Sequence, residues 1–545
     1  MASSIEKSSS KTQIKNELTI ALNAEFETLN PVVNSMMASI YIQDVALRPL
    51  VALDPQGKAY PVLIEDIPTF KNHNLKLLPN SGLQAEISFL PGANWGDGFP
   101  VTCEDLKFSW MVGNHPNVSA PARNNYENIE DIIVDSKESK KCRIIFKQAQ
   151  WNFYLNLPRP MAAHLEQKIF DKYKNESQAY ERNSLYVRQP ELAGLYNGPY
   201  TVSELRLGSH VSLLPNKFFY GRAPYFKKIT FKFIVNSSAM EANLLTGTVD
   251  VASSAGFSFD QAIAFEKKVK SKELPFRVDF VASSIFANIV FNLDNTILKE
   301  KKVRIALAHA LNRQELSEAF FEGRQKPAFH FSTPLDSWYT ENPKDIVIYT
   351  FSRAKANELL QQAGWIMKPD GFRYKEGKKL VLTMSSVVDL KLTEMIEVYI
   401  QSAWKKVGVD LQIKNYPARV LFSQVLHERK FELGFYSSVS SPDNSQRSTL
   451  HSSMIPSASN SWSGYNRAGW KNKKVDQWLD QVDQEFDSQK RIRLMGKILH
   501  AYTEDLPALT TYYRANNSVV PLGLKNYQLT SGVFTEYLKI EDWSF

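Results

Sequence analysis

The sequence predicts an α/β protein that is divided into at least two lobes. Its 545 residues exceed the size that one hydrophobic core normally organises. Helix and strand patterns follow one another with short glycine links, which is typical of α/β organisation. A passage from strand to helix lies near the middle of the chain, at residues 286–323. We interpret this passage as the point where one lobe leads into the other.

In this passage, residues 287–293 alternate apolar side chains as a strand does, and Asp294-Asn295 forms a turn. A helix should follow, because apolar residues recur there at helical spacing. That stripe consists of Val303, Ala306, Leu307, Ala310 and Leu311. Asn312 and Glu315 have the spacing of a capping box, so they predict a second helix, which Gly323 ends.

The chain before this passage contains several short strands. Residues 17–22 and 83–90 are strand-like, and residues 48–61 predict a hairpin with an Asp-Pro-x-Gly turn. Turns should dominate the Gly- and Pro-rich segment that follows residue 90. Thr102 and Asp105 then predict the capped start of a helix.

Helices and strands alternate again after the passage. Ser352 should cap a helix that Gly364 ends. An apolar stripe from residue 396 to residue 407 predicts another helix, and residues 409–413 alternate as a strand. Two late helices carry apolar stripes at 475–482 and 492–502, and residues 512–520 return to a strand pattern.

The composition is that of a globular protein, with 43% hydrophobic and 22% charged residues. The formal net charge is only +8, and the Lys/Arg groups are short and scattered. A nucleic-acid surface normally needs a denser stripe, so we interpret these groups as solvated surface and expect no nucleic-acid partner. No run approaches the roughly 20 apolar residues that cross a bilayer.

Cys103 and Cys142 are the two cysteines of the chain. We favour two separate buried thiols, and a disulfide between them stays open because sequence does not give their separation. Neither cysteine has a partner at zinc-ligand spacing, so we expect no metal site there. The Ser- and Lys-rich residues 1–16 should form a flexible tether. Such a tether fits a chain whose export signal has been removed, or a spacer behind a lipidated N-terminal cysteine.

Several motifs resemble one protein family, in the same order along nearly the whole chain. The first are LVALDPQGKAYPVL, PGANWGDGFPVTCEDLKFSW and NGPYTVSELRLGSHVSLLPNKFFYGRAPYFKKITF. LLTGTVDVA, FNLDNTILKEKKVRIALAHALNR, FSRAKANELLQQAGW and WKKVGVDLQI continue the series. Together they resemble the periplasmic solute-binding proteins of peptide ABC importers, the family-5 extracellular solute-binding proteins. Cys103 stands where the family usually has Ala.

The resemblance implies the two-lobed periplasmic-binding-protein fold of the cluster C type. Such a fold has an extra subdomain in the first lobe and a hinged cleft between the lobes. On this basis we expect lobe I to comprise residues 17–49, 191–285 and 515–545, and its extra subdomain to comprise 50–190. Residues 286–514 should form lobe II.

The ligand should contact residues 431–470, which are rich in Ser, Asn, Tyr and Trp. By composition alone, an ordinary surface loop is the favoured interpretation of this stretch. The resemblance favours a different one, because in the family this region crosses the cleft and lines the ligand. Our ligand-binding candidates are Phe435, Tyr436, Ser437, Ser438, Asn444, Arg447, Asn460, Trp462, Tyr465 and Asn466. Arg447 suits a peptide carboxylate, although a solvated or structural role is the favoured alternative.

One departure from the family bears on the ligand. Peptide-binding members commonly follow the Gly-aromatic pair with an Asp that anchors the peptide α-ammonium. Ser438 stands at that position here, and a hydroxyl does not replace the charge-assisted bond of a carboxylate. Free-amino-terminal dipeptides are therefore in doubt. Longer peptides that are held along their backbone, and blocked ligands, remain open.

We expect a monomeric, non-enzymatic binding protein that captures short peptides and delivers them to the membrane permease of an ABC importer. We expect it in the periplasm, either free or anchored by a lipid, with no cofactor. A hydrolase is disfavoured because the chain has no G-x-S-x-G, H-E-x-x-H or Walker motif. A metal- or haem-carrying member of the same family is a second alternative, with His451 as its single candidate ligand. A chemoreceptor of the same fold is a third.

Overall fold

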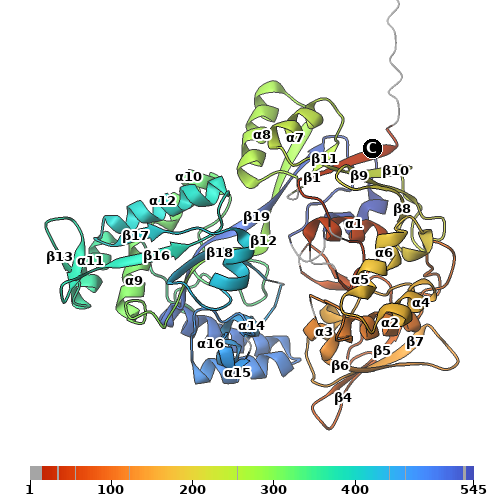
Figure 1. The fold of residues 1–545 in the computed structure, drawn as a ribbon, viewed down its shortest axis with the longest axis horizontal. Coiled ribbons are helices and arrows are strands. Elements are labelled where there is room, and N and C mark those ends of the chain that lie inside the picture. Colours follow the sequence, from red (N-terminus) through yellow and green to blue (C-terminus); the bar gives the residue numbers. More distant parts are fainter. Residues whose placement is uncertain are drawn as a thin grey trace, which may run out of the picture.

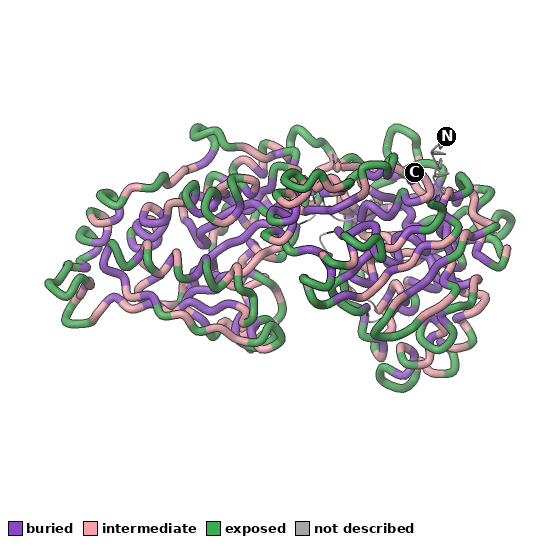
Figure 2. Tube along the Cα trace, turned by 90° about the horizontal axis from the view of Figure 1, so that it is seen from above, coloured by how far each residue is buried: buried purple, intermediate pink, exposed green. Residues whose placement is uncertain are grey.

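The protein is described here from a computed structural model. The described residues are 15–26, 28–33, 36–55, 57–121, 123–253, 256–440, 442–460, 462–531 and 535–545, without the side chains of residues 124 and 237. Residues 1–14 of the predicted tether therefore lie outside the described residues. The described chain forms a mixed α/β structure of two bodies, joined by the long strands β12 (Phe276–Phe291) and β19 (Ala508–Pro521) (Figures 1 and 2).

One ten-stranded sheet runs through both bodies in the order β17-β16-β18-β12-β19-β11-β1-β10-β9-β8. β12 and β19 pair antiparallel from Phe276↔Pro521 to Val290↔Ala508. Their register is interrupted between Ala282 and Phe286, and again between Ala287 and Asn288. Such irregularities bend a strand and increase its local twist. The sheet therefore changes direction where the chain passes from one body to the other.

The first body contains the β1 end of this sheet, a four-stranded sheet and a hairpin. Its strands are β1 (Glu17–Leu22), β2 (Val51–Leu53), β3 (Ala59–Pro61), β4 (Leu75–Leu77), β5 (Leu83–Ser88), β6 (Ile129–Val134), β7 (Lys141–Phe146), β8 (Tyr200–Arg206), β9 (His210–Pro215), β10 (Lys228–Phe233) and β11 (Val251–Ala252). Its helices are α1 (Met37–Ala46), α2 (Cys103–Asn114), α3 (Arg123–Glu127), α4 (Ala163–Tyr173), α5 (Ala179–Asn183), α6 (Leu185–Arg188), α7 (Ser237–Leu245) and α8 (Phe259–Lys272).

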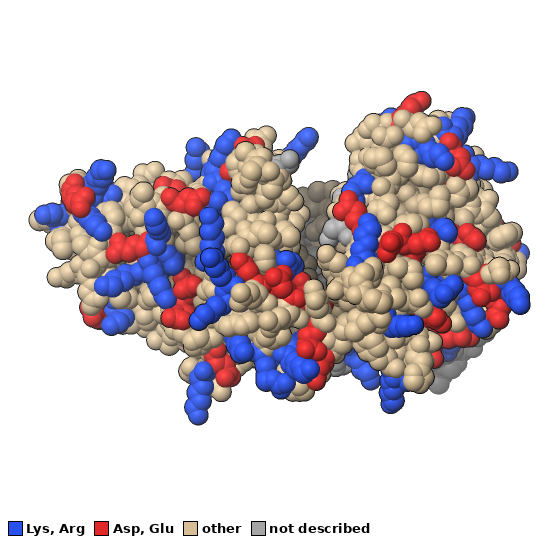
Figure 3. All heavy atoms as spheres, turned by 90° about the horizontal axis from the view of Figure 1, so that it is seen from below, with Lys and Arg blue, Asp and Glu red and all other residues tan. Residues whose placement is uncertain are grey.

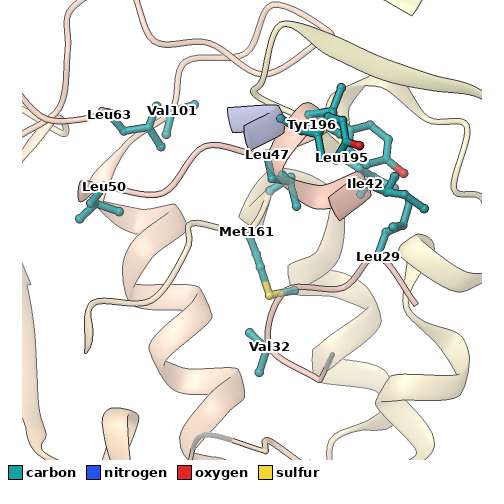
Figure 4. Close-up of a cluster of buried hydrophobic side chains, with 14 of the residues drawn as sticks. Leu29, Val32, Ile42, Leu47, Leu50, Leu63, Val101, Met161, Leu195 and Tyr196 are labelled. Carbon is teal, nitrogen blue, oxygen red and sulfur yellow. The ribbon is translucent and has the colours of Figure 1, made fainter. Parts of the chain in front are cut away.

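One continuous hydrophobic core fills most of the first body. Leu47, Leu63, Met161 and Leu195 come from distant parts of the chain and converge in it (Figure 4). The core thus includes side chains from the predicted main part and from the predicted extra subdomain. The boundaries at residues 50 and 190 stay predictions.

The second body contains the other end of the sheet and most of the later helices. Its strands are β13 (Ile366–Met367), β14 (Arg373–Lys375), β15 (Lys378–Lys379), β16 (Val381–Ser385), β17 (Asp410–Ile413) and β18 (Leu433–Val439). Its helices are α9 (Lys301–Ala310), α10 (Arg313–Phe321), α11 (Arg353–Gln362), α12 (Lys391–Lys405), α13 (Ala418–Val420), α14 (Arg447–Leu450), α15 (Lys473–Gln484) and α16 (Ser488–Asp505).

Two cores flank the sheet of the second body. Ala287, Ile289 and Phe291 of β12 pack with α9–α12 on one face. Phe286 and Val290 pack with α15 and α16 on the other. Successive residues of a strand point to opposite faces of the sheet, so neighbouring side chains of β12 join different cores.

The locally encoded elements agree with the sequence predictions. Thr102 and Asp105 form a capping box at the start of α2. Asn312 accepts a hydrogen bond from the Glu315 backbone at the start of α10, over 3.1 Å. Ser352 does the same for Lys355 in α11, over 3.2 Å. Helix ends that carry their own caps are therefore specified by the nearby sequence.

The crossing strands are longer than predicted. β12 begins at Phe276 rather than residue 287, and β19 begins at Ala508 rather than residue 512. The first half of β12 was not predicted because its sequence, which includes Arg277 and Asp279, lacks the apolar alternation of a half-buried strand. Pairing with β19 makes this half a strand.

The favoured interpretation of the cysteines was wrong. Cys103 and Cys142 form a disulfide, with their Cα atoms 6.0 Å apart. Both residues are buried, as expected. The first turn of α2 lies against β7 in space, although 39 residues separate the two cysteines, and this long-range approach is not visible in the sequence.

Candidate functional site

A cavity lies beside β12 and β18 in the second body. It encloses about 460 Å³ of empty space, including its opening to solvent. Residues from β12, β18, the 446–470 segment and the start of β19 surround it. They are Phe286, Asn288, Val290, Phe331, Tyr436, Ser438, Gln446, Thr449, Leu450, Tyr465, Asn466, Arg467, Ala468, Trp470, Tyr502, Pro507 and Ala508. We call this space the β18 cavity.

The floor of the β18 cavity is a polar patch on the two strands. Asn288 of β12 pairs with Tyr436 of β18, two positions along from the pair Phe286↔Ser438 and therefore on the same face of the sheet. The Asn288 side-chain amide donates to the Tyr436 carbonyl over 3.0 Å and to the Ser438 hydroxyl over 3.2 Å. These bonds fix the Ser438 hydroxyl in the floor.

The wall opposite the strands is held in place by Asn466. Its amide nitrogen donates to the carbonyls of Leu450 and His451, each over 3.1 Å, and of Trp470 over 2.9 Å. The Trp470 backbone N–H donates back to the Asn466 amide oxygen over 3.1 Å. Asn466 is only 1% exposed, so its role is to join the turns of the wall rather than to present a free polar group.

Within the described chain, most of the outer edge of β18 has no strand partner beside this cavity. β12 pairs with β18 along its whole length, from Leu433 to Val439. On the other edge, β16 pairs only with Leu433 and Gly434. From Phe435 to Val439, no strand of the described chain occupies that edge. Unpaired strand edges bind extended segments through main-chain hydrogen bonds.

The end of β18 lies at the junction of the two bodies. The Ser440 N–H donates to the Ser284 carbonyl over 2.8 Å, and the Ser284 N–H donates to the Ser531 carbonyl over 3.1 Å. Ser531 belongs to the C-terminal part of the first body, and its hydroxyl donates to the Pro55 carbonyl over 3.3 Å. The β18 cavity is therefore next to the place where the bodies meet.

The segment after β18 approaches the first body closely. Gly57 turns the β2–β3 hairpin with a φ of +80°, and a Cβ built there would lie 3.4 Å from the Pro442 Cβ. Asp336 fixes this segment from behind, because its carboxylate accepts from the Asp443 N–H over 2.7 Å. A second hollow of about 1230 Å³, including open solvent, lies between the bodies along residues 277–282, with Pro55 and Leu335 on its walls.

The bodies also touch between Trp151 of the first body and the α15–α16 connection of the second. The Trp151 N–H donates to the Asp483 carbonyl over 3.2 Å. The Arg491 guanidinium lies 3.9 Å from the centre of the Trp151 ring. Phe70 and Phe486 meet edge to face, with ring centres 5.0 Å apart. Figure 3 shows a hollow between the two bodies, with acidic and basic residues interspersed on the face in view.

The structure brings four of the predicted ligand residues to the β18 cavity, namely Tyr436, Ser438, Tyr465 and Asn466. Tyr436 and Ser438 share the cavity face of β18, since they are two residues apart. Tyr465 is 58% exposed, so its ring is accessible to a ligand.

The structure places the other candidates elsewhere. Phe435 is 3% exposed and packs in the core on the opposite face of β18, the face toward which Ser437 also points. The Arg447 guanidinium pairs with the Asp480 carboxylate. The remaining candidates hold turns. Asn444 accepts from the Gln446 N–H over 2.8 Å, Asn460 donates to the Ile455 carbonyl over 2.9 Å, and the Trp462 N–H donates to the Ser457 carbonyl over 2.8 Å.

Several lining residues were not among the predicted candidates. Asn288 comes from β12, outside the stretch from which all candidates were chosen. The sequence did contain a sign of it. Asn288 alternates with the apolar residues Phe286 and Val290, so it lies on the same face of the strand, and on a buried face it would be an inward-facing polar group. Arg467, which directly follows the candidate Asn466, was not predicted either. Tyr502 is buried in α16, and burial raises the pKa of its hydroxyl well above the usual range, so it stays neutral.

His451, the candidate of the metal-carrying alternative, lies behind the wall. Its Nδ1 is 2.7 Å from the Ser453 hydroxyl, and its Nε2 is 3.7 Å from the Asp480 carboxylate. Among the described residues, no group of three or more His, Cys, Asp or Glu side chains is arranged to hold a metal ion. The helices of the described chain include none with the length and apolar character of a membrane span.

Residues 81–455 match the bacterial extracellular solute-binding proteins, family 5 (middle region). This match covers well over half of the chain, and the protein belongs to this family. It is thus a solute-binding protein of the class that serves ABC importers, a class without catalytic activity. The oligopeptide-binding protein AppA of Bacillus subtilis is 24% identical over 538 residues, which cover 96% of this chain and 91% of AppA.

Solved structures with the same fold hold different ligands. The oligopeptide-binding protein of Thermus thermophilus, complexed with a pentapeptide, is 23% identical with a TM-score of 0.76, covering 97% of this chain and 96% of that one. NikZ of Campylobacter jejuni, complexed with Ni(L-His), is 22% identical with a TM-score of 0.75, covering 97% of this chain and all of NikZ (100%). These likenesses confirm the two-lobed fold. Because proteins of this fold bind different ligands, the ligand of this protein has to be inferred from the residues of its site.

Proposed function

We propose that this protein captures peptides between its two bodies and delivers them to the membrane permease of an ABC importer. It acts as a monomer on the outer side of the cytoplasmic membrane, in the periplasm. The observation that carries the proposal is the open outer edge of β18 beside the β18 cavity. A peptide in extended form pairs its main chain with such an edge, while its side chains enter the neighbouring cavity.

The disulfide supports the location. Disulfides persist in oxidising compartments and are rare in the cytosol. The similarity to AppA, a protein named for oligopeptide binding, supports the ligand class. Delivery follows from closure, because a ligand that contacts both bodies stabilises the closed arrangement, which the permease then recognises.

The proposed ligand is a peptide that is longer than a dipeptide or blocked at its amino terminus. Among the described lining residues, no Asp or Glu faces the cavity to bind an α-ammonium group. Ser438 offers a hydroxyl, which the Asn288 amide already engages. The amino terminus therefore contributes little, and the main chain contributes most of the affinity.

Native mass spectrometry of the purified protein tests the ligand class. We expect adducts whose masses fit short peptides and which dissociate on acidification. An adduct that contains a metal or a haem would overturn the proposal and favour another ligand class of the same family.

Methylated peptides test the strand pairing. A captured peptide is synthesised with one N-methyl group at each position in turn, and binding is measured by calorimetry. Each lost hydrogen bond should weaken binding by about tenfold, and only every second position should respond, because alternate N–H groups face the edge of a strand. Equal tolerance at all positions would contradict pairing with β18.

A further inference from the structure

Arg467 is the charged side chain that lines the β18 cavity, and no other lining residue of the described chain carries a charge at neutral pH. Its backbone is fixed on both sides. The Arg467 N–H donates to the Tyr465 carbonyl over 2.7 Å, and its carbonyl accepts from the Arg429 guanidinium over 3.0 Å. The side chain therefore starts from a rigid point in the wall.

Aromatic rings surround the guanidinium of Arg467. Its central carbon lies 5.2 Å from the ring centre of Tyr436, 5.5 Å from that of Tyr465 and 5.8 Å from that of Phe422. Rings at these distances attract a cation and hold a planar guanidinium without using its N–H groups. Tyr465 and Phe422 are 58% and 39% exposed, so this aromatic frame is open to a ligand.

Within the described chain, the N–H groups of the Arg467 guanidinium have no protein partner. Among the described residues, the guanidinium forms no ion pair and donates no hydrogen bond, and its buried Nε is left without an acceptor. Its neighbours differ. Arg429 pairs with Asp294 over 2.8 Å, and Arg447 pairs with Asp480. A buried donor without a partner in an otherwise satisfied wall indicates a group that is supplied from outside the chain.

We propose that Arg467 binds a carboxylate of the captured ligand inside the β18 cavity. A carboxylate is the anionic group of a peptide that matches the fork of the Arg467 guanidinium, because its two oxygens accept two parallel N–H bonds. Two parts of a peptide supply it, the C-terminus and an Asp or Glu side chain. This inference rests on the proposed function and makes it more specific, because it gives the protein a preference for acidic over neutral ligands.

The experiment measures binding of three peptides of one parent sequence by calorimetry. The reference peptide is amidated and carries Gln at the tested position. The second peptide differs from it only in a free C-terminus, and the third differs only in carrying Glu instead of Gln. One of these two carboxylate peptides should bind at least about tenfold more tightly than the uncharged reference. The peptide that shows the preference identifies which carboxylate Arg467 binds.

Arg467→Gln should remove this preference, so that the carboxylate peptides and the uncharged reference bind this variant with affinities within about twofold of one another. The melting temperature of the variant reports that it is folded. Arg467→Lys keeps the charge but loses the fork, so it should retain part of the preference. Arg447→Gln is the matched comparison, because its guanidinium pairs with Asp480 outside the cavity, and it should keep the full preference.

Two results would overturn the inference. In one, the parent protein binds carboxylate and carboxamide peptides equally well. In the other, Arg467→Gln weakens all three peptides by the same factor, which would indicate a structural role. Failure of every peptide to bind the parent protein would instead refute the proposed function itself, so the two failures are distinguishable.

Discussion

Asp336 is a buried carboxyl group on which the position of the segment after β18 depends. It is 7% exposed and accepts hydrogen bonds from the backbone N–H groups of Thr333 and Asp443, over 2.6 and 2.7 Å. Burial raises its pKa to about 6, although these hydrogen bonds oppose the shift. In the unfolded chain an Asp has a pKa of about 3.9. The folded state therefore binds this proton more tightly than the unfolded state does.

The sign of the resulting pH dependence follows. Between about pH 4 and pH 6 the folded state retains a proton that the unfolded state releases, so Asp336 lowers stability as the pH rises through this window. Asp336→Asn does not titrate. The unfolding free energy of this variant, relative to the parent protein, should increase by about 2 kcal/mol from pH 4 to pH 7.

Urea unfolding of both proteins at several pH values measures this difference. Any penalty for placing an amide against two N–H donors shifts all values equally and leaves the slope intact. A difference that stays constant with pH would contradict the raised pKa of Asp336.

At the scale of elements, the disulfide between α2 and β7 closes a loop of 39 residues. Closing a loop of this length in the unfolded chain accounts for about 4 kcal/mol of stability in the chain-entropy model. Replacement of both cysteines by Ala should lower the melting temperature by several degrees. Reductant should destabilise the parent protein to a similar extent and leave the variant unchanged. A variant as stable as the oxidised parent would contradict this role.

An element could be predicted from the sequence when the interactions that form it join residues that are close together in the chain. Capped helices such as α10 and α11 were predictable because Asn312 and Ser352 act on residues three positions away. The first half of β12 was not, because its strand conformation depends on pairing with β19, more than 200 residues later. The disulfide was missed for the same reason.

The candidate site shows the same limit within a single strand. Phe435 and Tyr436 are adjacent and both aromatic, so composition made them equal candidates. The register Asn288↔Tyr436 turns Tyr436 toward the cavity and Phe435 into the core. The region 431–470 could be chosen from the family resemblance. The face of the strand on which each of its side chains lies could be assigned only once the pairing of β18 with β12 was known.

At the scale of the whole molecule, the contact around Trp151 joins the bodies at a point outside the crossing strands. The Arg491 guanidinium covers the Trp151 ring, and Phe70 meets Phe486 nearby. These contacts are lost if the bodies separate there, so they stabilise the arrangement seen in this structure, which we take to be the closed one of the proposed function. A ligand that binds the closed arrangement is affected by them without touching them.

Trp151→Ala should therefore weaken peptide binding from a distance. Loss of the cation–π contact and of buried ring area removes about 2 kcal/mol from the closed arrangement, which corresponds to at most about a 30-fold weaker affinity. Small-angle X-ray scattering of the ligand-free variant should show a larger radius of gyration than that of the parent protein.

Phe99→Ala is the matched control, because Phe99 is also a partly exposed aromatic residue of the first body but stacks on His164 within that body. It should change neither the radius of gyration nor the affinity. Excess peptide should return the Trp151→Ala variant to the compact dimensions of the parent protein, since bound ligand supplies the free energy that the lost contact no longer provides. If Trp151→Ala expands the protein but binds peptide with unchanged affinity, closure and capture are not coupled, and the ligand is held by the second body alone.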